Sequence, residues 1–300
     1  MREKQSLFQQ ACSISKLHWL EIPFRTVILF GMWLAVAVPL TALAQTDSLA
    51  DASNSHHNSS TVAPLRVVPN PAFGAGERLT FLVRYGPIVA GNARLSIPKI
   101  VEVNGRPSYH IVSEAWSNSF FSKFYKVEDR VESYTDADGI FSWWFRKQLR
   151  EGGFKADQEV TFDQLNHLAI TKKGDKRDTL AVPPFVQDVL SAMYFIRTMT
   201  LAPGDTAFID NHSDGKLFPL KVVVHGREKI NIKAGKFTCL VVEPFLKTPA
   251  LFQQKGRVVV HMTDDVRKIP VMMTSQIYVK AFKLGAVVAE LEKMEGVPGR

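Results

Sequence analysis

The sequence predicts a mainly β domain: an antiparallel meander that forms a curved sheet or an open barrel, with one helix packed against it. Two observations lead to this prediction. Short segments with apolar residues at every second position recur along most of the chain, and this period is typical of strands with one buried face. Turn signals separate these segments at intervals of roughly 8 to 12 residues, which favours a barrel or curved sheet over alternating strands and helices.

Residues 79–85 give the clearest strand, because every second side chain is Leu, Phe, Val or Tyr. Gly86-Pro87 predicts a break after this strand, and Asn104-Gly105 predicts a two-residue hairpin turn further along. Gly-containing dipeptides separate the later segments in the same way. The first group of further strands is predicted over residues 89–97, 109–116, 126–135, 140–150, 154–162, 167–172 and 176–182.

One helix is predicted over Phe185–Leu201, where apolar residues recur at spacings of three and four. Asp188 falls in its first turn and Arg197 in a late turn, which suits the helix dipole. Pro183-Pro184 precedes the helix and Pro203-Gly204 ends it. Strands then return over residues 206–209, 217–225, 237–245, 256–262, 271–282 and 286–293.

Residues 1–44 have the order of a secretory signal. Four basic residues precede an uncharged apolar run over 27–40, and Ala42-Leu43-Ala44 supplies small residues at a cleavage site. A run of about 14 residues spans about 21 Å, less than the roughly 30 Å hydrocarbon core of a bilayer. We therefore expect cleavage after Ala44, a periplasmic location and no transmembrane segment in the remaining chain.

The residues after the cleavage site divide into two parts. Residues 45–72 are rich in Ser, Asn, Ala and Pro, so they bury too little apolar surface to offset the entropy of ordering and are predicted to be a disordered tether. Residues 73–295 are predicted to form a single β-rich domain. Cys239 is the one cysteine after Ala44, which excludes an internal disulfide, and its apolar strand predicts a buried, inert thiol.

The charge of the chain limits its partners. The whole sequence carries a formal charge of +8, and residues 1–44 hold four basic and two acidic side chains, which leaves +6 after cleavage. This balance suits contact with anionic lipid headgroups or polyanionic glycans, but the charges are scattered, and a merely solvated surface explains them as well. No run of Lys and Arg reaches the density of a nucleic-acid patch, so we expect no nucleic acid partner.

A set of dispersed pieces lies between residue 76 and about residue 293: Gly76-Glu77, Tyr85-Gly86, Gly91, residues 124–129, residues 187–191, Tyr194, Arg197, residues 235–239, Asp264-Asp265, Arg267, Pro270-Val271 and Glu290-Leu291. No single piece is specific, but their order over more than two hundred residues is. By these pieces the chain resembles the bacterial domain-of-unknown-function 3108 family. The resemblance implies an exported envelope protein with a predominantly β fold, similar to the open barrels of periplasmic lipoprotein carriers. It implies no reaction and no catalytic residues.

An aromatic cluster is the most suggestive candidate site. Alternation places the aromatic residues at 141, 143 and 145 on one face of a strand, and further aromatic residues lie shortly before it. A half-open barrel lined in this way would hold an acyl chain or another apolar ligand, whereas an ordinary core would use the same residues for packing. Trp144 points to the opposite face, as a surface contact would. The candidate ligand-binding residues are Phe124, Tyr125, Phe141, Trp143 and Phe145.

No catalytic or metal-binding set emerges, and no cofactor is expected. Ser191 lacks a Gly-x-Ser-x-Gly elbow, Asp264-Asp265 sits in a turn beside two basic residues, and the histidines lack metal-ligand spacing. The leading hypothesis is an exported, periplasmic, non-enzymatic domain that binds or carries an apolar or amphiphilic envelope component. The alternatives are a protein or glycan interaction module of the cell envelope and an envelope hydrolase.

Overall fold

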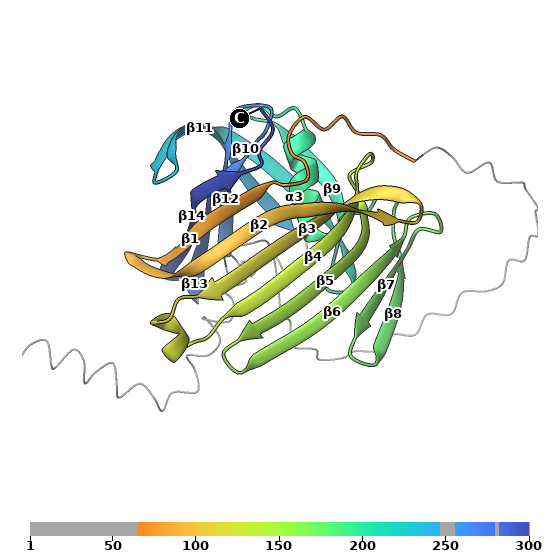
Figure 1. Cartoon of the computed structure of the whole chain (residues 1–300), viewed down its shortest axis with the longest axis horizontal. Helices are drawn as coiled ribbons and strands as arrows, with labels where there is room; N and C mark the ends of the chain where they lie inside the picture. Colours follow the sequence, from red (N-terminus) through yellow and green to blue (C-terminus); the bar gives the residue numbers. More distant parts are fainter. Residues whose placement is uncertain (1–64, 247–255, 280–281, 300) are drawn as a thin grey trace, which may run out of the picture.

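The computed structural model describes residues 65–246, 256–279 and 282–299. The predicted signal over 1–44 and residues 45–64 of the predicted tether lie outside them. The described residues form one antiparallel sheet of fourteen strands with a single α-helix (Figure 1), which confirms the predicted mainly β fold. Within these residues, no helix is long and apolar enough to cross a bilayer.

Each predicted segment falls on a strand, but several strands are longer than predicted. The strand predicted over 89–97 runs to Val103, that over 206–209 to Ser213 and that over 217–225 to Ile232. The predicted strand 271–282 is divided, because β13 ends at Val279 and Phe282 already begins β14. The intervening Lys280-Ala281 carries no turn-forming residue type that would mark the division in the sequence. The elements are β1 Arg78–Tyr85, β2 Ile88–Val103, β3 Arg106–Ser117, the 3-10 turn η3 Phe121–Lys123, β4 Glu128–Asp136, β5 Ser142–Glu151, β6 Phe154–Asp163, β7 Leu168–Lys173, β8 Lys176–Ala181, α3 Val189–Thr198, β9 Thr206–Ser213, β10 Lys216–Ile232, β11 Gly235–Leu246, β12 Gly256–Thr263, β13 Pro270–Val279 and β14 Phe282–Glu295.

The sheet order brings the first and last strands together in its middle: β8-β7-β6-β5-β4-β3-β2-β1-β14-β13-β12-β11-β10-β9. Leu79 of β1 pairs with Leu95 of β2 on one side and with Met294 of β14 on the other. The two edges, β8 and β9, are joined by the segment that contains α3. Because every pairing is antiparallel, the β1–β2, β3–β4, β5–β6, β7–β8 and β9–β10 turns share one end of the sheet, which we call the mouth end.

The helix α3 is shorter than the predicted Phe185–Leu201 and begins at Val189. Asp188 is its N-cap: the Asp188 Oδ1 atom accepts hydrogen bonds from the backbone N–H groups of Leu190 at 2.7 Å and Ser191 at 2.9 Å. Before the cap the chain is extended, and Gln187 forms a parallel bridge with Asn211 of β9. Apolar spacing alone could not reveal this cap-defined start.

The helix lies across the end of the sheet opposite the mouth, which we call the plugged end (Figure 1). At its start, the Asp188 Oδ2 atom accepts hydrogen bonds from the hydroxyls of Ser133 on β4 at 2.6 Å and Ser142 on β5 at 2.5 Å. At its other end, Arg197 reaches Glu77, next to β1. The helix is therefore fixed to both halves of the sheet.

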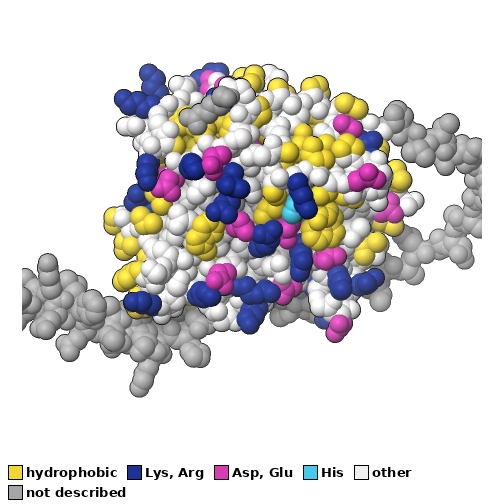
Figure 2. All heavy atoms as spheres, viewed as in Figure 1, with side chains coloured by type: hydrophobic (Ala, Val, Ile, Leu, Met, Phe, Trp, Pro, Cys, Tyr) yellow, Lys and Arg dark blue, Asp and Glu magenta, His cyan; other side chains and the backbone are white. Residues whose placement is uncertain are grey.

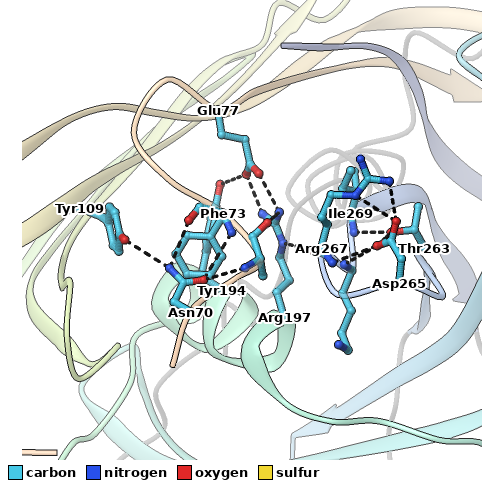
Figure 3. A network of polar contacts seen from close by, with 12 residues as sticks. Asn70, Phe73, Glu77, Tyr109, Tyr194, Arg197, Thr263, Asp265, Arg267 and Ile269 are labelled. Atoms are coloured by element: carbon cyan, nitrogen blue, oxygen red, sulfur yellow. Dashed lines mark hydrogen bonds and ion pairs between the residues drawn. The ribbon is translucent and has the colours of Figure 1, made fainter. Parts of the chain in front are cut away.

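A buried ion pair connects the helix to β1 (Figure 3). The Arg197 Nη1 and Nη2 atoms donate to the two carboxylate oxygens of Glu77 at 2.6 and 2.7 Å, and both side chains are 0% exposed. Burial alone would lower the pKa of Arg197, but the Glu77 carboxylate outweighs it and raises that pKa. The Tyr194 hydroxyl donates to Glu77 at 3.2 Å, and Arg197 Nε donates to the Arg267 carbonyl at 3.1 Å.

Part of the predicted tether packs on the domain, so its predicted end at residue 72 is too late. Arg66 donates two hydrogen bonds, to the carbonyls of Gly139 at 2.9 Å and Ile140 at 2.8 Å. Ala72 and Phe73 are buried, and the Ala72 carbonyl accepts a hydrogen bond from Arg197. These long-range contacts order a segment whose composition alone indicates disorder.

One large apolar cluster fills the plugged end, where inward-facing residues of β1, β2 and β9–β14 pack against α3. Leu79, Phe81 and Ile97 are fully buried there. Cys239 also belongs to this cluster, and burial raises the pKa of its thiol to about 11. A neutral, buried thiol fits the inert role predicted from the sequence.

The ion pair leads to a stability prediction. Arg197→Met leaves the Glu77 carboxylate buried without its guanidinium, and we expect a loss of about 3–5 kcal/mol in the free energy of unfolding. The double variant Glu77→Leu/Arg197→Met removes both charges and should recover most of that loss. Urea unfolding provides the measurement.

The exposed pair of Arg78 and Glu295, 3.9 Å apart, supplies the matched control. Arg78→Met should change the free energy of unfolding by less than about 1 kcal/mol. Equal losses for Arg78→Met and Arg197→Met would contradict the role given to the buried pair.

Candidate functional site

The inner face of the curled sheet differs between its two ends. Near α3 it carries the large buried side chains of the main cluster. Towards the mouth its residues on β2 and β3 are small: Gly91 pairs with Ser117, and Ala93 pairs with Ala115. Inward-facing Tyr85, Ala115 and Val131 are only partly buried. Side chains on this part of the inner face are therefore smaller, and several are less buried, than those at the plugged end.

Two buried carboxyl groups lie at the mouth end of this face, Asp129 at the start of β4 and Glu151 at the end of β5. The Asp129 Oδ1 atom accepts a hydrogen bond from the Arg150 backbone N–H at 2.8 Å, and its carboxyl hydrogen-bonds with Glu151. Burial nevertheless raises the pKa of Asp129. The raised pKa favours the protonated form of Asp129, and a protonated carboxyl donates a hydrogen bond as well as accepting one.

Sequence reasoning did not single out Asp129 and Glu151 as a site. A signal was present, because alternation on β4 and β5 places both residues on the face that also carries Phe145. What the sequence could not supply is the register that places Glu151 beside the start of β4, seen in the isolated bridge between Val127 and Glu151.

A loop between β3 and β4 forms part of the rim at the mouth end. It contains η3, where the rings of Phe120 and Phe124 lie 5.5 Å apart in an edge-to-face arrangement. Phe120 is 60% exposed and Phe124 is 76% exposed. The Tyr125 ring lies inward of them against Gly152, where a Cβ atom would come within 2.8 Å of the ring. Gly152 also has a φ of +56°, so two constraints favour glycine at this turn.

The five residues predicted to bind a ligand do not form one cluster. Phe124 and Tyr125 lie at the mouth end, whereas Phe141 and Trp143 lie at the opposite end of the β4–β5 hairpin. Phe141, Trp143 and Phe145 are all buried. The structure thus separates the set into a partly exposed rim group and a packed group.

The packed group is held by specific contacts. The Phe141 ring lies edge-on to Trp143 at 5.1 Å and near Phe185 at 5.4 Å. The Trp143 Nε1 atom donates a hydrogen bond to Asp136 at 3.2 Å. Phe145 belongs to a second, smaller apolar cluster with Val160, Phe162, Ala169, Val182 and Val186.

This smaller cluster lies where the two edges of the sheet, near β8 and β9, come together. His212 of β9 is buried, its ring is edge-on to Phe162 of β6 at 5.5 Å, and its Nε2 atom lies 3.5 Å from the Thr171 hydroxyl of β7. Nearby, the Lys147 Nζ atom pairs with Asp214 at 2.6 Å. The β9–β10 region therefore packs on the inner face of β5–β7, although β8 and β9 do not pair with each other. We call this contact the seam.

The outer face carries a separate aromatic group. Trp144 points outward, as predicted, and stacks on Tyr134 with ring centres 4.8 Å apart. Tyr134 in turn contacts the His110 ring at 5.1 Å. Figure 2 looks onto the outer face of this half of the sheet, where hydrophobic side chains gather among Lys and Arg.

The polar residues that the sequence offered for catalysis or metal binding make structural hydrogen bonds. No group of three or more His, Cys, Asp or Glu in the described part of the chain could hold a metal ion. The Ser191 hydroxyl is buried and bonded to the Asp188 backbone, so it serves the helix cap. Asp265 accepts hydrogen bonds from Thr263 and Arg267 within its own turn.

Comparison with known proteins matches residues 80–290 to a family described as DUF3108, protein of unknown function. A comparison with curated proteins found no match. Among solved structures, the chain is similar to a β-barrel-like protein of the domain of unknown function DUF1849 from Brucella abortus. That similarity has a TM-score of 0.50 at 11% identity and covers 79% of this chain and 100% of the other. It concerns the fold alone.

Two further solved structures are more distant. One, from Bacteroides fragilis, is proposed to be an exported protein with a YmcC-like fold; it has 16% identity, a TM-score of 0.27 and coverage of 77% of this chain and 99% of the other. The second, from Parabacteroides distasonis, is proposed to be a lipoprotein; it has 12% identity, a TM-score of 0.28 and coverage of 76% and 99%. These TM-scores are too low to carry an argument.

The packed and exposed aromatic groups should respond differently to truncation. Trp143→Ala removes a buried ring and its hydrogen bond to Asp136, and we expect a loss of about 3–5 kcal/mol in the free energy of unfolding. Phe124→Ala removes an exposed ring and should change that free energy by no more than about 0.5 kcal/mol. Urea unfolding followed by fluorescence measures both. An unchanged stability for Trp143→Ala would contradict its assignment to the core.

The seam should weaken in acid. Burial lowers the pKa of His212 from 6.5 to about 4. The Asp214 carboxylate acts in the opposite direction and raises this pKa, whereas the charge of Lys173 lowers it further. The folded state therefore disfavours the charged ring, so stability present at neutral pH is lost as the pH falls through 6.5 towards 4. From pH 7 to pH 5 we expect a loss of about 2 kcal/mol from this group.

The variant His212→Gln isolates the contribution of His212 to the pH dependence. Its free energy of unfolding should fall less between pH 7 and pH 5 than that of the wild type, as measured by urea unfolding at both pH values. Parallel pH profiles for the two proteins would show that the pKa of His212 is the same in the folded and unfolded states, and would contradict this prediction.

Proposed function

The chain belongs to the DUF3108 family of proteins of unknown function, and we propose that it is a non-enzymatic, periplasmic domain that binds or carries an amphiphilic envelope component. The signal-like order of residues 1–44 supports export. The ligand would lie against the inner face of the sheet at the mouth end.

The small and partly buried residues of the inner face towards the mouth are the observation that carries this proposal. A helix and large side chains occupy the plugged end, whereas the mouth end presents small residues such as Ala93 and Ala115. Protein interiors are normally packed to the density of organic crystals. Partly exposed apolar side chains on a concave face, such as Val131, are typical of surfaces that receive apolar ligands.

The buried carboxyl pair supports an amphiphile over a purely apolar ligand. Asp129 and Glu151 lie at the mouth end of the same face, and a protonated Asp129 would donate a hydrogen bond to a polar head group as well as accept one. An acyl chain would then lie towards α3, with its polar head group at the carboxyl pair. Phe124 and Tyr125 belong to the rim beside this position, and Phe141, Trp143 and Phe145 support the wall from within the core.

The outer aromatic group favours one second candidate, an interaction module for an envelope protein or glycan. Trp144 and Tyr134 form a stacked, partly exposed platform, and aromatic platforms bind sugar rings and protein partners. A hydrolase is not proposed, because the hydroxyl that lies beside a histidine, that of Thr171 next to His212, is buried in the seam.

Filling the mouth end tests the proposal. Ala115→Trp places a large ring on the inner face, and we expect it to abolish binding of a fluorescent fatty-acid probe while the melting temperature changes little. The matched control, Trp144→Ala on the outer face, should leave probe binding intact. Probe titration and thermal unfolding are measured on the same samples, and native mass spectrometry of protein from its own periplasm should show a bound amphiphile.

Two results would contradict the amphiphile proposal. The first is a wild-type protein that binds no probe and carries no amphiphile. The second is Ala115→Trp binding the probe as the wild type does, because the ligand would then lie elsewhere. Loss of a glycan or protein partner in Trp144→Ala alone would favour the interaction module.

A further inference from the structure

The rim at the mouth end exposes large apolar side chains. Phe120 and Phe124 of the loop around η3 are 60% and 76% exposed, and Ile88 in the neighbouring β1–β2 turn is 50% exposed. The two segments lie side by side in Figure 1, and the Asn118 backbone N–H donates to the Ala90 carbonyl at 2.9 Å. We call these three side chains the apolar rim. Exposed groups of this kind commonly mark an interaction surface.

The apolar rim is held outward by its own loop. The Asn118 side chain donates to the Val89 carbonyl at 2.7 Å and accepts a hydrogen bond from the Phe121 N–H at 2.9 Å. The Ser117 and Ser122 hydroxyls are bonded at 2.7 Å. These contacts fix the loop before any partner binds, so little ordering entropy opposes association through its aromatic tip.

The charge of the molecule is concentrated at the same end. Counted with two residues of each flanking strand, the described turns at the mouth end hold ten Lys or Arg and five Asp or Glu residues, within 84–89, 116–129, 150–155, 172–177 and 212–217. Counted in the same way, the described turns at the plugged end hold six basic and eight acidic residues, within 102–107, 135–143, 162–169, 180–190, 197–207, 231–236 and 262–271. Figure 2 shows Lys and Arg along the lower border of the molecule.

We propose that the mouth end docks on the surface of a bilayer that contains anionic phospholipid. Phe120, Phe124 and Ile88 enter the interface between headgroups and acyl chains, and Lys123 with the basic turns contacts the headgroups. Aromatic side chains favour this interface, and basic residues add attraction to anionic lipid. The inference rests on the proposed function and adds its partner: docking in this orientation places the open inner face against the leaflet that supplies or receives the amphiphile.

Charge complementarity favours a membrane over a second copy of the chain. A symmetric dimer through the apolar rim would bring the same surface of both copies together. Lys123, which lies between Phe120 and Phe124 in the sequence, and the basic turns around the rim would then face their own copies and repel them. An anionic bilayer instead attracts both the basic turns and the apolar rim.

The test uses flotation with vesicles of phosphatidylethanolamine and phosphatidylglycerol, and with vesicles of phosphatidylcholine alone. We expect the residues 45–300 protein to bind the anionic vesicles. Phe120→Ser/Phe124→Ser should weaken that binding by about tenfold or more, since the rim loses its two rings. Lys123→Glu should weaken it as well, and added salt should reduce binding of the wild type. The matched control is Phe208→Ser, which removes a ring that is 59% exposed on β9.

Probe binding in solution separates this inference from the proposed function. The rim variant should bind the fluorescent fatty acid as the wild type does, because its inner face is unchanged. Failure of the wild type to bind anionic vesicles, or equal binding by wild type and rim variant, overturns the docking inference even if probe binding persists. A dimer in sedimentation that dissociates in Phe120→Ser/Phe124→Ser also overturns it, since the rim would then be a protein interface.

Discussion

The ion pair between Glu77 and Arg197 is the interaction on which the arrangement depends. It joins four parts of the chain that are far apart in sequence: the start of β1, the end of α3, the N-terminal segment at Ala72 and the turn that contains Arg267. A fully buried pair is stable only when its remaining hydrogen-bonding groups are satisfied. The Tyr194 hydroxyl and two backbone carbonyls complete the pair in this way.

Because α3 is fixed at one end of the sheet, the two ends of the molecule differ. The helix and the large apolar cluster close the plugged end, so small and partly exposed residues are left on the inner face towards the mouth. The seam completes this arrangement without strand pairing, because His212 and Asp214 contact side chains of β5–β7. A contact built from side chains is more sensitive to pH than a ladder of backbone hydrogen bonds.

Three features coincide at the mouth end: the small and partly buried residues of the inner face, the carboxyl pair of Asp129 and Glu151, and the rim with Phe120 and Phe124. Each alone has an ordinary structural explanation. Together they combine an apolar surface, a polar group at its opening and an exposed basic rim, which are the requirements for exchanging an amphiphile with a membrane surface. This coincidence is the reason to prefer the proposed carrier over a module that acts through Trp144.

The sequence by itself determined the strands, most turns and the presence of one helix, because period-two burial and turn chemistry are local properties. Tertiary structure alone decided the pairing of β1 with β14, the cap-defined start of α3 at Asp188 and the packing of residues 66–73. It also decided that Phe124 and Phe141 lie at opposite ends of a hairpin. Contacts between distant segments depend on register and curvature, which no local pattern of residues specifies.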